Sequence, residues 1–409
     1  MKLESSIDAG AAQDAAAAPT PIKVCMHVLK EARDDVRAIR AATALIEAGY
    51  AVSVVDIEAS SRVPSEEDIW GIHVQHLKVP SWHTSRRFEL WFFIKAVQVL
   101  FLGVLRLIKT RADIYHACEL TALPASFIAA TLRRKPLIFE IYDLQFPVPG
   151  TRVGFWRRLA WLVTLLHAVI LPRCAAVIVT SPLHAQEIRN RFHPKEIALV
   201  RNIPMYREVP KSDHMRRYLG LGPETRIALF HGMLHAGREL NRLIHAAKYL
   251  EQDIVIVLRG KSEGATQAQL EALIASEGVA DRVKITPFVP FEVMLDWTAS
   301  ADIGLIIYRP DYSLNMRTLL PNKLFEYLMA GLPVLATPLD AVVEVIRTYD
   351  VGQVVSSVKP ADIGAAVNTM LSDRAALDRM RCNALEAARN ELHWEKESQQ
   401  LIHLYRSLG

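Results

Sequence analysis

The chain has 409 residues, of which 51% are hydrophobic, so it is too long for one ordinary core and predicts two domains. Its formal net charge is only +4, from 48 basic and 44 acidic side chains, and this balance argues against a nucleic-acid partner. The four cysteines stand singly, with neither zinc spacing nor a disulfide framework, so the expected setting is the reduced cytoplasm.

Residues 1–20 are rich in alanine and contain acidic residues but no apolar core segment. They predict a disordered tail, and a signal peptide is not expected. Two later stretches, Phe88–Leu107 and Leu159–Pro172, are very apolar. Neither supplies the roughly 20 apolar residues that a bilayer span needs, so no membrane-spanning helix is expected.

In the first half, short strand-like runs alternate with amphipathic helices such as Val36–Ala48 and Pro182–Arg191. This alternation predicts a parallel sheet built from strand–helix–strand units. The expected strands are Lys23–Val28, Ala51–Val55, Ile114–His116, Leu137–Phe139, Ala176–Val179 and Ala198–Val200.

The pattern restarts after the polar stretch Arg207–Pro223, with a linker expected near residues 203–223. We therefore expect an α/β protein of two Rossmann-like, doubly wound parallel-sheet domains, over residues 21–205 and 206–391. Ligands bind outside the carboxyl ends of such strands, so two facing sheets predict a deep cleft. The second set of strands is Ile227–Phe230, Ile254–Leu258, Val283–Ile285, Ile303–Ile307, Val334–Ala336 and Val351–Val355.

Two patterns resemble known ligand motifs and are set aside. Gly260–Ser262 resembles the end of a phosphate-binding P-loop, but Val255 stands where the earlier glycine is required. His116 and Cys118 would share one face of a strand, yet a pair is too few for a zinc site. No metal site is therefore expected.

The most informative segment is Leu319–Thr337, which reads as a loop, a short helix capped by Asn322 and ended by Gly331, and a strand. The helix N-terminus offers free N–H groups to an anion, and Lys323 adds a positive charge in the first turn. Glu326 lies off the apolar face and can accept two hydrogen bonds from a vicinal diol such as a ribose. The spacing alone leaves open that Lys323 and Glu326 are simply the solvated face of a surface helix.

This segment resembles the donor-binding segment of family 4 of the retaining, two-domain (GT-B) glycosyltransferases, in the branch with the Pro-Asn-Lys-Leu-Phe-Glu-Tyr sequence. Shorter resemblances follow in the family's order along nearly the whole chain, and the last implies a C-terminal helix, residues 392–409, that crosses back to the first domain. They are Asp35–Arg37 with Gly49–Val52, Ala112–Ala117, Leu199–Pro204, Phe230–Gly232 with Arg238, and Trp394–Glu395 with Leu404–Tyr405.

The resemblance implies a nucleotide-sugar donor site in the second domain. Glu326 matches the glutamate that binds the ribose, whereas Thr318 stands where the family has a first glutamate. Arg238 and Lys323 would stabilise the diphosphate, although Arg238 could also be a solvated arginine at a helix start. No metal or other cofactor is expected, because the sequence lacks Asp-x-Asp. The expected donor-binding residues are Arg238, Thr318, Leu319, Leu320, Asn322, Lys323 and Glu326, and Asn315 or Arg317 could replace the missing glutamate.

The first domain, residues 21–205, should supply the acceptor side. His116 matches one histidine of the family's strand ending, while Cys118 stands where the family has its usual histidine. A thiol cannot replace an imidazole as a hydrogen-bonding group near neutral pH. Glu119 and Asp143, both at strand ends, are candidate proton acceptors, or else loop carboxylates that cap helices. The candidate catalytic residues are thus His116, Glu119 and Asp143.

The segment 86–111 carries six basic residues against one acidic residue, a net charge of +5, and several aromatic residues. Basic and aromatic helices often lie in the membrane interface, so an anionic membrane surface is an expected partner and a peripheral location on the inner face of the cell membrane is expected. The alternative is a domain helix packed on the sheet with basic ends.

Taken together, these features predict transfer of a sugar, with retention of configuration, from a nucleoside-diphosphate sugar to a glycan or lipid-linked acceptor. Such transfer would serve cell-surface polysaccharide or glycoconjugate synthesis. A non-catalytic nucleotide-sugar-binding partner subunit and a nucleotide-sugar epimerase of the same fold remain alternatives.

Overall fold

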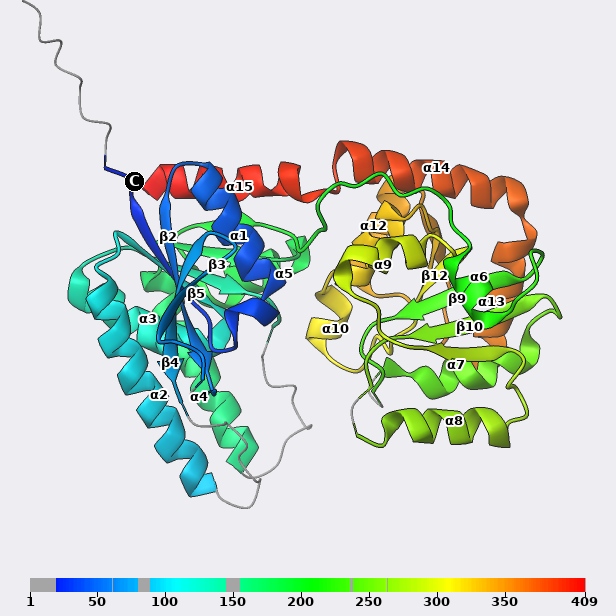
Figure 1. Ribbon diagram of the computed structural model, residues 1–409, viewed down its shortest axis with the longest axis horizontal. Helices are drawn as coiled ribbons and strands as arrows, with labels where there is room; N and C mark the ends of the chain where they lie inside the picture. The colour runs from blue at the N-terminus through cyan, green and yellow to red at the C-terminus, as the bar shows by residue number, and fades with distance from the viewer. Residues whose placement is uncertain are drawn as a thin grey trace, which may run out of the picture.

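The computed structural model describes residues 20–60, 62–79, 89–144, 155–235, 238–262 and 264–408, with the side chains of residues 89–93 and 155–160 left out. The tail expected over residues 1–20 therefore lies outside the described residues, except for residue 20. Figure 1 shows two halves, each with a sheet that helices cover on both faces.

The first half contains an eight-stranded sheet in the order β3-β4-β2-β1-β5-β6-β7-β8, parallel except for the β3–β4 pair. The strand order reverses at β1, which pairs with both β2 and β5. Its strands are β1 (Lys23–His27), β2 (Ala51–Glu58), β3 (Glu66–Ile69), β4 (Ile72–Lys78), β5 (Ile114–Cys118), β6 (Leu137–Ile141), β7 (Ala176–Val179) and β8 (Ile197–Leu199).

The described residues of this half also form helical segments. Helices α2, α3, α4 and α5 pack on one face of the sheet, and α1 packs on the other. The segments are η1 (Ala32–Asp34), α1 (Val36–Glu47), α2 (Glu89–Thr110), α3 (Glu119–Arg133), α4 (Phe155–Ile170), η2 (Leu171–Arg173) and α5 (Pro182–Phe192).

The hairpin of β3 and β4 was not expected from the sequence. Strand β3 has the sequence EEDI, and only Ile69 in it is buried, so it lacks the apolar run that indicates a strand. Trp70 and Gly71 form the turn, and both have positive φ. Pairing with β4 at the edge of the sheet, and not burial of its own side chains, makes this segment a strand.

The second half contains a six-stranded, all-parallel sheet in the order β11-β10-β9-β12-β13-β14. The central strands are almost wholly buried because helices cover both faces. The strands are β9 (Arg226–His231), β10 (Ile254–Arg259), β11 (Val283–Thr286), β12 (Ile303–Ile306), β13 (Val334–Ala336) and β14 (Gly352–Val354). Two doubly wound parallel sheets confirm the expected fold class.

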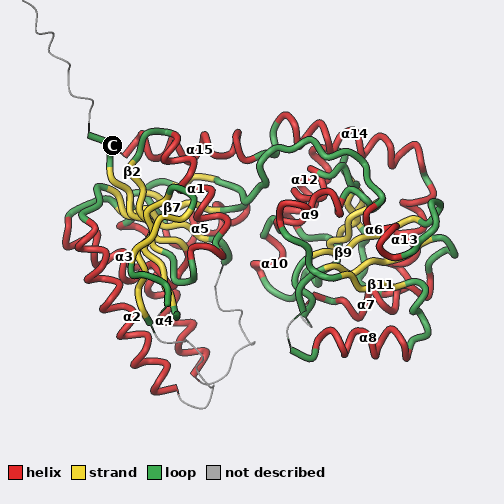
Figure 2. Tube along the Cα trace, in the orientation of Figure 1, coloured by secondary structure: helices red, strands yellow, loops and turns green. Residues whose placement is uncertain are grey.

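The remaining helices surround this second sheet or lead away from it, and Figure 2 separates them from the strands by colour. The linker expected near residues 203–223 contains a short helix, α6. The helices are α6 (His214–Leu219), α7 (Leu240–Ala246), η4 (Ala247–Tyr249), α8 (Thr266–Ser276), α9 (Phe291–Thr298), α10 (Leu314–Thr318), α11 (Asn322–Met329), α12 (Asp340–Tyr349), α13 (Pro360–Ser372), α14 (Arg374–Asn390) and α15 (Trp394–Leu408).

Helix α15 returns to the first half, so that α14 and α15 run along one side of both halves (Figure 1). Trp394, Leu401, Leu404 and Tyr405 join the hydrophobic core formed by β1 and α1. The Tyr405 hydroxyl also lies 2.8 Å from Nδ1 of His116, deep in the first sheet. The end of the chain is therefore part of the first domain's core.

Further hydrogen bonds join the two halves near the carboxyl ends of the first sheet. The Leu144 amide donates to Oδ1 of Asn315 (2.7 Å), and the Ser181 hydroxyl donates to the Thr318 carbonyl (2.6 Å). The Asn202 amide donates to Oδ1 of Asn322 (2.9 Å). These bonds hold α10 and the start of α11 against the first domain.

Candidate active site

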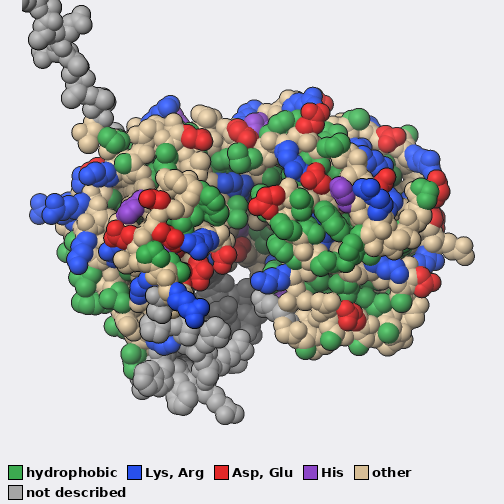
Figure 3. Space-filling view, viewed as in Figure 1, with side chains coloured by type: hydrophobic (Ala, Val, Ile, Leu, Met, Phe, Trp, Pro, Cys, Tyr) green, Lys and Arg blue, Asp and Glu red, His purple; other side chains and the backbone are tan. Residues whose placement is uncertain are grey.

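A cavity of about 650 Å³ lies between the two sheets, at the carboxyl ends of their strands. The loops after β1, β5 and β6 line one side, and the loops after β9 and β10 with the start of α11 line the other. Figure 3 shows a hollow between the two halves, with acidic and basic side chains at its rim. This is the place that facing doubly wound sheets reserve for a ligand.

The second-domain wall of the cavity holds two cations, Lys323 and Arg238, beside two aromatic rings. Nζ of Lys323 lies 3.6 Å from the centroid of the Phe230 ring and 5.4 Å from that of Tyr308. Nη1 of Arg238 donates to the Tyr308 hydroxyl at 3.0 Å. Burial would raise the pKa of Tyr308, yet Lys323 and Arg238 lower it on balance. The two cations therefore create a positive potential at this wall.

Neither cation has a carboxylate at ion-pair distance among the described residues. Burial lowers the pKa of Lys323, and the neighbouring Tyr308 only partly opposes this shift. Cations held in place without a matching anion suit a ligand that carries negative charge of its own.

The backbone also approaches the cavity closely at two glycines. Gly232, after β9, has φ 130°, and a Cβ there would lie 3.3 Å from Nζ of Lys323. A Cβ on Gly260, after β10, would lie 1.8 Å from the Gly232 carbonyl oxygen. Only glycine allows these two loops to meet beside Lys323.

Glu326 lies one turn further along α11. Its Oε2 is 3.0 Å from Nε2 of His231, at the end of β9. Burial would raise the pKa of Glu326, but His231 lowers it on balance, so the carboxylate stays ionised in the cavity. Tyr327 fixes the helix here, because its hydroxyl donates to the Leu229 carbonyl (3.0 Å) and accepts from the His231 amide (3.1 Å).

The other expected donor residues lie in two environments. Leu319, Leu320 and Asn322 line the cavity, although the N-cap of α11 is Pro321 and Asn322 is the first helical residue, which corrects the expected cap. Thr318 does not line the cavity. Its hydroxyl donates to the Leu314 carbonyl within α10 (2.8 Å), so the Thr318 side chain contacts its own helix and not a ligand.

The first-domain wall carries carboxylates. Nζ of Lys30 lies 3.2 Å from Oδ2 of Asp35 and 3.7 Å from Oε1 of Glu119. Glu119 begins α3 at φ 66°, a left-handed conformation that costs a non-glycine residue energy and is often found at functional sites. Burial raises the pKa of Glu119, and Lys30 opposes the shift only in part. Asp143 also lines this wall and accepts from the Asn315 amide (3.1 Å).

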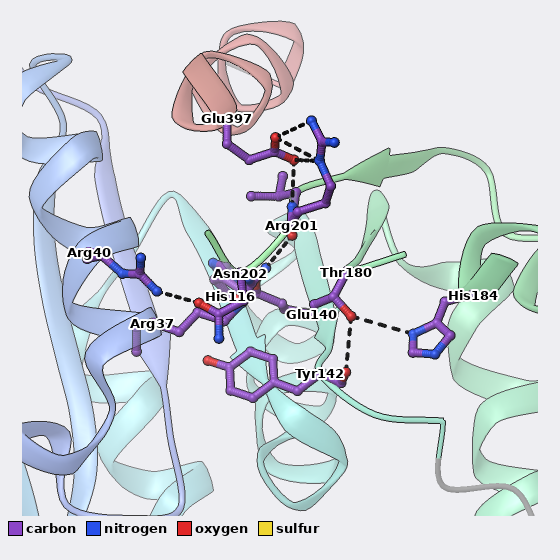
Figure 4. Close-up of polar contacts among 12 residues, drawn as sticks. Arg37, Arg40, His116, Glu140, Tyr142, Thr180, His184, Arg201, Asn202 and Glu397 are labelled. Atoms are coloured by element: carbon purple, nitrogen blue, oxygen red, sulfur yellow. Dashed lines mark hydrogen bonds and ion pairs between the residues drawn. The ribbon is translucent and has the colours of Figure 1, made fainter. Parts of the chain in front are cut away.

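His116 does not reach the cavity, contrary to the expectation that it is catalytic. It is fully buried, with Nδ1 2.8 Å from the Tyr405 hydroxyl and Nε2 3.2 Å from Oε2 of Glu140. Figure 4 shows His116 and Glu140 grouped beside Arg37 and Tyr142. Both ring nitrogens face other protein groups, so His116 is a member of a buried polar cluster.

The same cluster contains the one set of three potential metal ligands in the described part of the chain. The ligand atoms of His116, Cys118 and Glu140 lie within 4.8 Å of one another. Arg37, however, already donates to Glu140 from Nε at 2.8 Å and from Nη2. Burial raises the pKa of the Cys118 thiol well above its usual value. The Arg37 guanidinium already neutralises the Glu140 carboxylate, and the Cys118 thiol is neutral. The cluster is therefore a charge-compensated ion pair and does not suit a metal cation.

Several cavity residues were not expected from the sequence. Lys30 and Arg40 come from the first domain, Arg259 is the last residue of β10, and Lys261 comes from the loop that follows. Lys261 belongs to the segment Gly260–Ser262, which is no P-loop but still places a lysine beside the cavity. The sequence could have identified Lys261 as a cavity residue, because it closely follows a strand of a doubly wound sheet, where such sheets bind ligands.

Solved structures with this architecture cover almost the whole chain. Sucrose-phosphate synthase from Thermosynechococcus elongatus has a TM-score of 0.77 at 17% identity, over 95% of this chain and 99% of that chain. The Anabaena protein HepE in complex with UDP-glucose has a TM-score of 0.70 at 15% identity, over 95% of this chain and 100% of that chain. At these identities the likeness shows the fold.

Family models match each domain separately. Residues 35–202 match the model described as "Glycosyl transferase 4-like domain", and residues 225–373 match "Glycosyl transferases group 1". The chain has the GT-B fold, and each of its two domains matches a glycosyltransferase family model. One curated relative is the D-inositol 3-phosphate glycosyltransferase of Thermomonospora curvata, 24% identical over 47% of this chain and 46% of that protein. The chain thus matches about half the length of this relative.

The two apolar stretches of the sequence, Phe88–Leu107 and Leu159–Pro172, fall largely within helices α2 and α4. The segment 86–111 is described as α2 from Glu89, while Arg86 and Arg87 lie outside the described residues. In the part of the chain that the structure describes, no helix is both long enough and apolar enough to cross a bilayer.

Proposed function

We propose that this glycosyltransferase binds a nucleoside-diphosphate sugar on the second-domain wall and transfers the sugar, with retention of configuration, to an acceptor on the first-domain wall. The observation that carries the proposal is a pair of cations, Lys323 and Arg238, that have no carboxylate at ion-pair distance among the described residues. The ionised Glu326 lies one helical turn from Lys323. HepE, a neighbour in fold, is known in complex with UDP-glucose, which supports a nucleotide sugar as the donor class.

In this proposal the diphosphate lies between Lys323 and Arg238, close to the backbone of Gly232 and Gly260. Breaking the bond to the sugar places additional negative charge on the diphosphate. Two fixed cations in a partly dry cavity stabilise that charge where it develops, without reorganising solvent. Glu326 accepts hydrogen bonds from the two ribose hydroxyls, while His231 orients its carboxylate.

The acceptor hydroxyl then approaches from the first-domain wall. The departing phosphate assists its deprotonation on the same face of the sugar, which accounts for retention. Glu119 and Asp143 are the carboxylates placed to hold acceptor hydroxyls or to take the proton, and the raised pKa of Glu119 brings it nearer to the pH at which a general base works well. We propose a glycan or a lipid-linked sugar as the acceptor.

Calorimetry with UDP and other nucleoside diphosphates tests the donor site through Glu326→Ala. Losing hydrogen bonds to a charged partner should weaken binding by about 2–4 kcal/mol. Glu386→Ala is the matched control, because Glu386 is an exposed glutamate on α14 of the same domain.

Unchanged affinity of the Glu326→Ala variant would remove the ribose assignment. Tight nucleotide binding by the wild type with no turnover of any nucleotide sugar would instead indicate the non-catalytic partner subunit.

A further inference from the structure

The solvent-facing side of helix α2 is apolar, where a surface helix normally carries polar residues. Its exposed positions are Ile94, Val97, Gln98, Phe101, Leu105 and Lys109, and their spacing of three or four residues places them on one stripe. Phe101 is 62% exposed and Val97 63%. The opposite side of α2, with Val99 and Leu107, packs into the first domain's core.

Helix α4 repeats this pattern on the same layer. Trp161, Leu162, Leu165 and Val169 form its exposed stripe, and the Trp161 side chain is 66% exposed. Helix α3, which packs against α2, adds Ile128 and Leu132 near its C-terminal end. These three helices share one face of the first sheet, so their exposed side chains form an apolar outer surface on that face, which we call the α2–α4 surface. In Figure 1, α2 and α4 extend below the first sheet, at the lower left of the molecule.

Basic residues dominate the charges of these helices. Over residues 94–135 and 161–173 the acidic residues are Asp113, which pairs with Lys135 at 2.9 Å, and Glu119, which lines the cavity. Glu66 of β3, outside these ranges, pairs with Arg106. The basic residues in the same ranges are Lys95, Arg106, Lys109, Arg111, Arg133, Arg134, Lys135 and Arg173. An exposed apolar surface bordered by positive charges complements a partner that has an anionic outer layer and an apolar interior.

We infer that the α2–α4 surface docks on an anionic membrane, with the stripes of α2 and α4 inserted into its interface and the basic residues facing lipid headgroups. A bilayer surface satisfies both features at once, and the helices lie along it without spanning it. Helix α3 begins at Glu119 in the cavity, so a membrane under this surface would present a lipid-linked acceptor to the first-domain wall. This link to the acceptor rests on the proposed function.

The test is co-sedimentation of the full chain with vesicles, in the absence of substrate. The wild type should bind phosphatidylcholine vesicles that contain phosphatidylglycerol more strongly than vesicles of phosphatidylcholine alone. Added salt should weaken the binding and not abolish it, because screening acts on the charges and leaves apolar insertion intact. Two double variants, Val97→Glu with Phe101→Glu and Trp161→Glu with Leu165→Glu, should each reduce partitioning by about tenfold.

Tyr218→Glu with Tyr249→Glu is the matched control, because it places the same two negative charges at exposed aromatic residues of the second domain and should leave binding unchanged. UDP affinity and the unfolding midpoint, measured on each variant, show that the donor site and the fold persist. Absent binding by the wild type, or binding that both double variants retain, would overturn the inference. So would light scattering that shows a wild-type dimer and monomeric double variants, since a second copy would then cover the surface. Vesicle binding without UDP binding would contradict only the proposed function.

Discussion

Arg37 and Glu140 form a buried ion pair in the first domain. Burial would raise the pKa of Glu140, but Arg37 and His116 hold it at about 2. A carboxylate whose pKa is lower in the folded than in the unfolded chain stabilises the fold above the unfolded value, near 4.5. That contribution is lost as the pH falls from about 4.5 towards 2.

Arg37→Met should therefore be strongly destabilising at neutral pH. It leaves the buried Glu140 carboxylate without its cation, and breaking a buried pair in this way costs about 3–5 kcal/mol. The deficit relative to wild type should shrink as the pH falls from 7 to 4, because burial without Arg37 raises the pKa of Glu140 and its protonation then removes the unpaired charge. Urea unfolding at pH 7 and pH 4 measures both effects.

Arg37→Lys is the control, since it keeps the charge and should be less damaging at pH 7. A deficit that is equal at both pH values would mean that lost packing, and not charge, explains the effect of Arg37→Met.

Among the elements, α15 shows how a distant segment completes a domain. Tyr405 is fully buried and contacts two residues far away in sequence, with its hydroxyl on His116 and its ring 5.6 Å from that of Tyr50. Oε2 of Glu397 also accepts from Nη2 of Arg201 at 2.8 Å (Figure 4). The helix is amphipathic, and the first sheet covers its apolar side.

Tyr405→Ala should lower the free energy of unfolding of the first domain by about 3–5 kcal/mol, the usual cost of removing a large buried aromatic side chain. Tyr405→Phe keeps the packing and removes one hydrogen bond, so it should cost only about 1 kcal/mol. Urea unfolding, with the two domains monitored separately, measures these differences.

If Tyr405→Ala proved as stable as wild type, α15 would not be an integral part of the first domain. The second domain's unfolding transition should stay in place in both variants and serves as the internal reference.

At the scale of the whole molecule, the cavity exists only because the two domains face one another. Carboxylates of the first domain lie opposite cations of the second, and the Asn315 and Asn322 hydrogen bonds hold the two walls together. This division suits a reaction in which an anionic leaving group and an acceptor hydroxyl meet between them. It also supplies the positive charge that a metal ion provides in other sites.

We therefore expect sugar transfer to be independent of divalent metal. Turnover of the productive nucleotide sugar, once identified by screening, should persist in excess EDTA, and added magnesium or manganese should not raise it. The physical reason is that Lys323 and Arg238 neutralise the diphosphate directly. Loss of activity on chelation, followed by recovery with magnesium or manganese, would show that the two cations are insufficient.

The sequence alone determined the two-domain α/β fold and much of the second-domain wall. Alternating apolar runs and amphipathic helices are local patterns, and they predicted every strand of the second sheet. Lys323 and Glu326 could be found because their segment resembles the family's donor-binding segment, and because a helix N-terminus offers free N–H groups to an anion. Edge strand β3 was not predicted, because pairing with β4, and not its own side chains, makes this segment a strand.

Only the tertiary structure decided which residues face the cavity and which are buried. His116 and Glu119 lie three residues apart, yet one contacts Glu140 and Tyr405 in the core and the other lines the cavity. That difference depends on contacts with residues more than 20 and nearly 300 positions away, which no local spacing records. The same holds for α2 and α4. Apolar periodicity predicts that a stripe exists, whereas the folded chain determines which stripe is buried and which stays exposed.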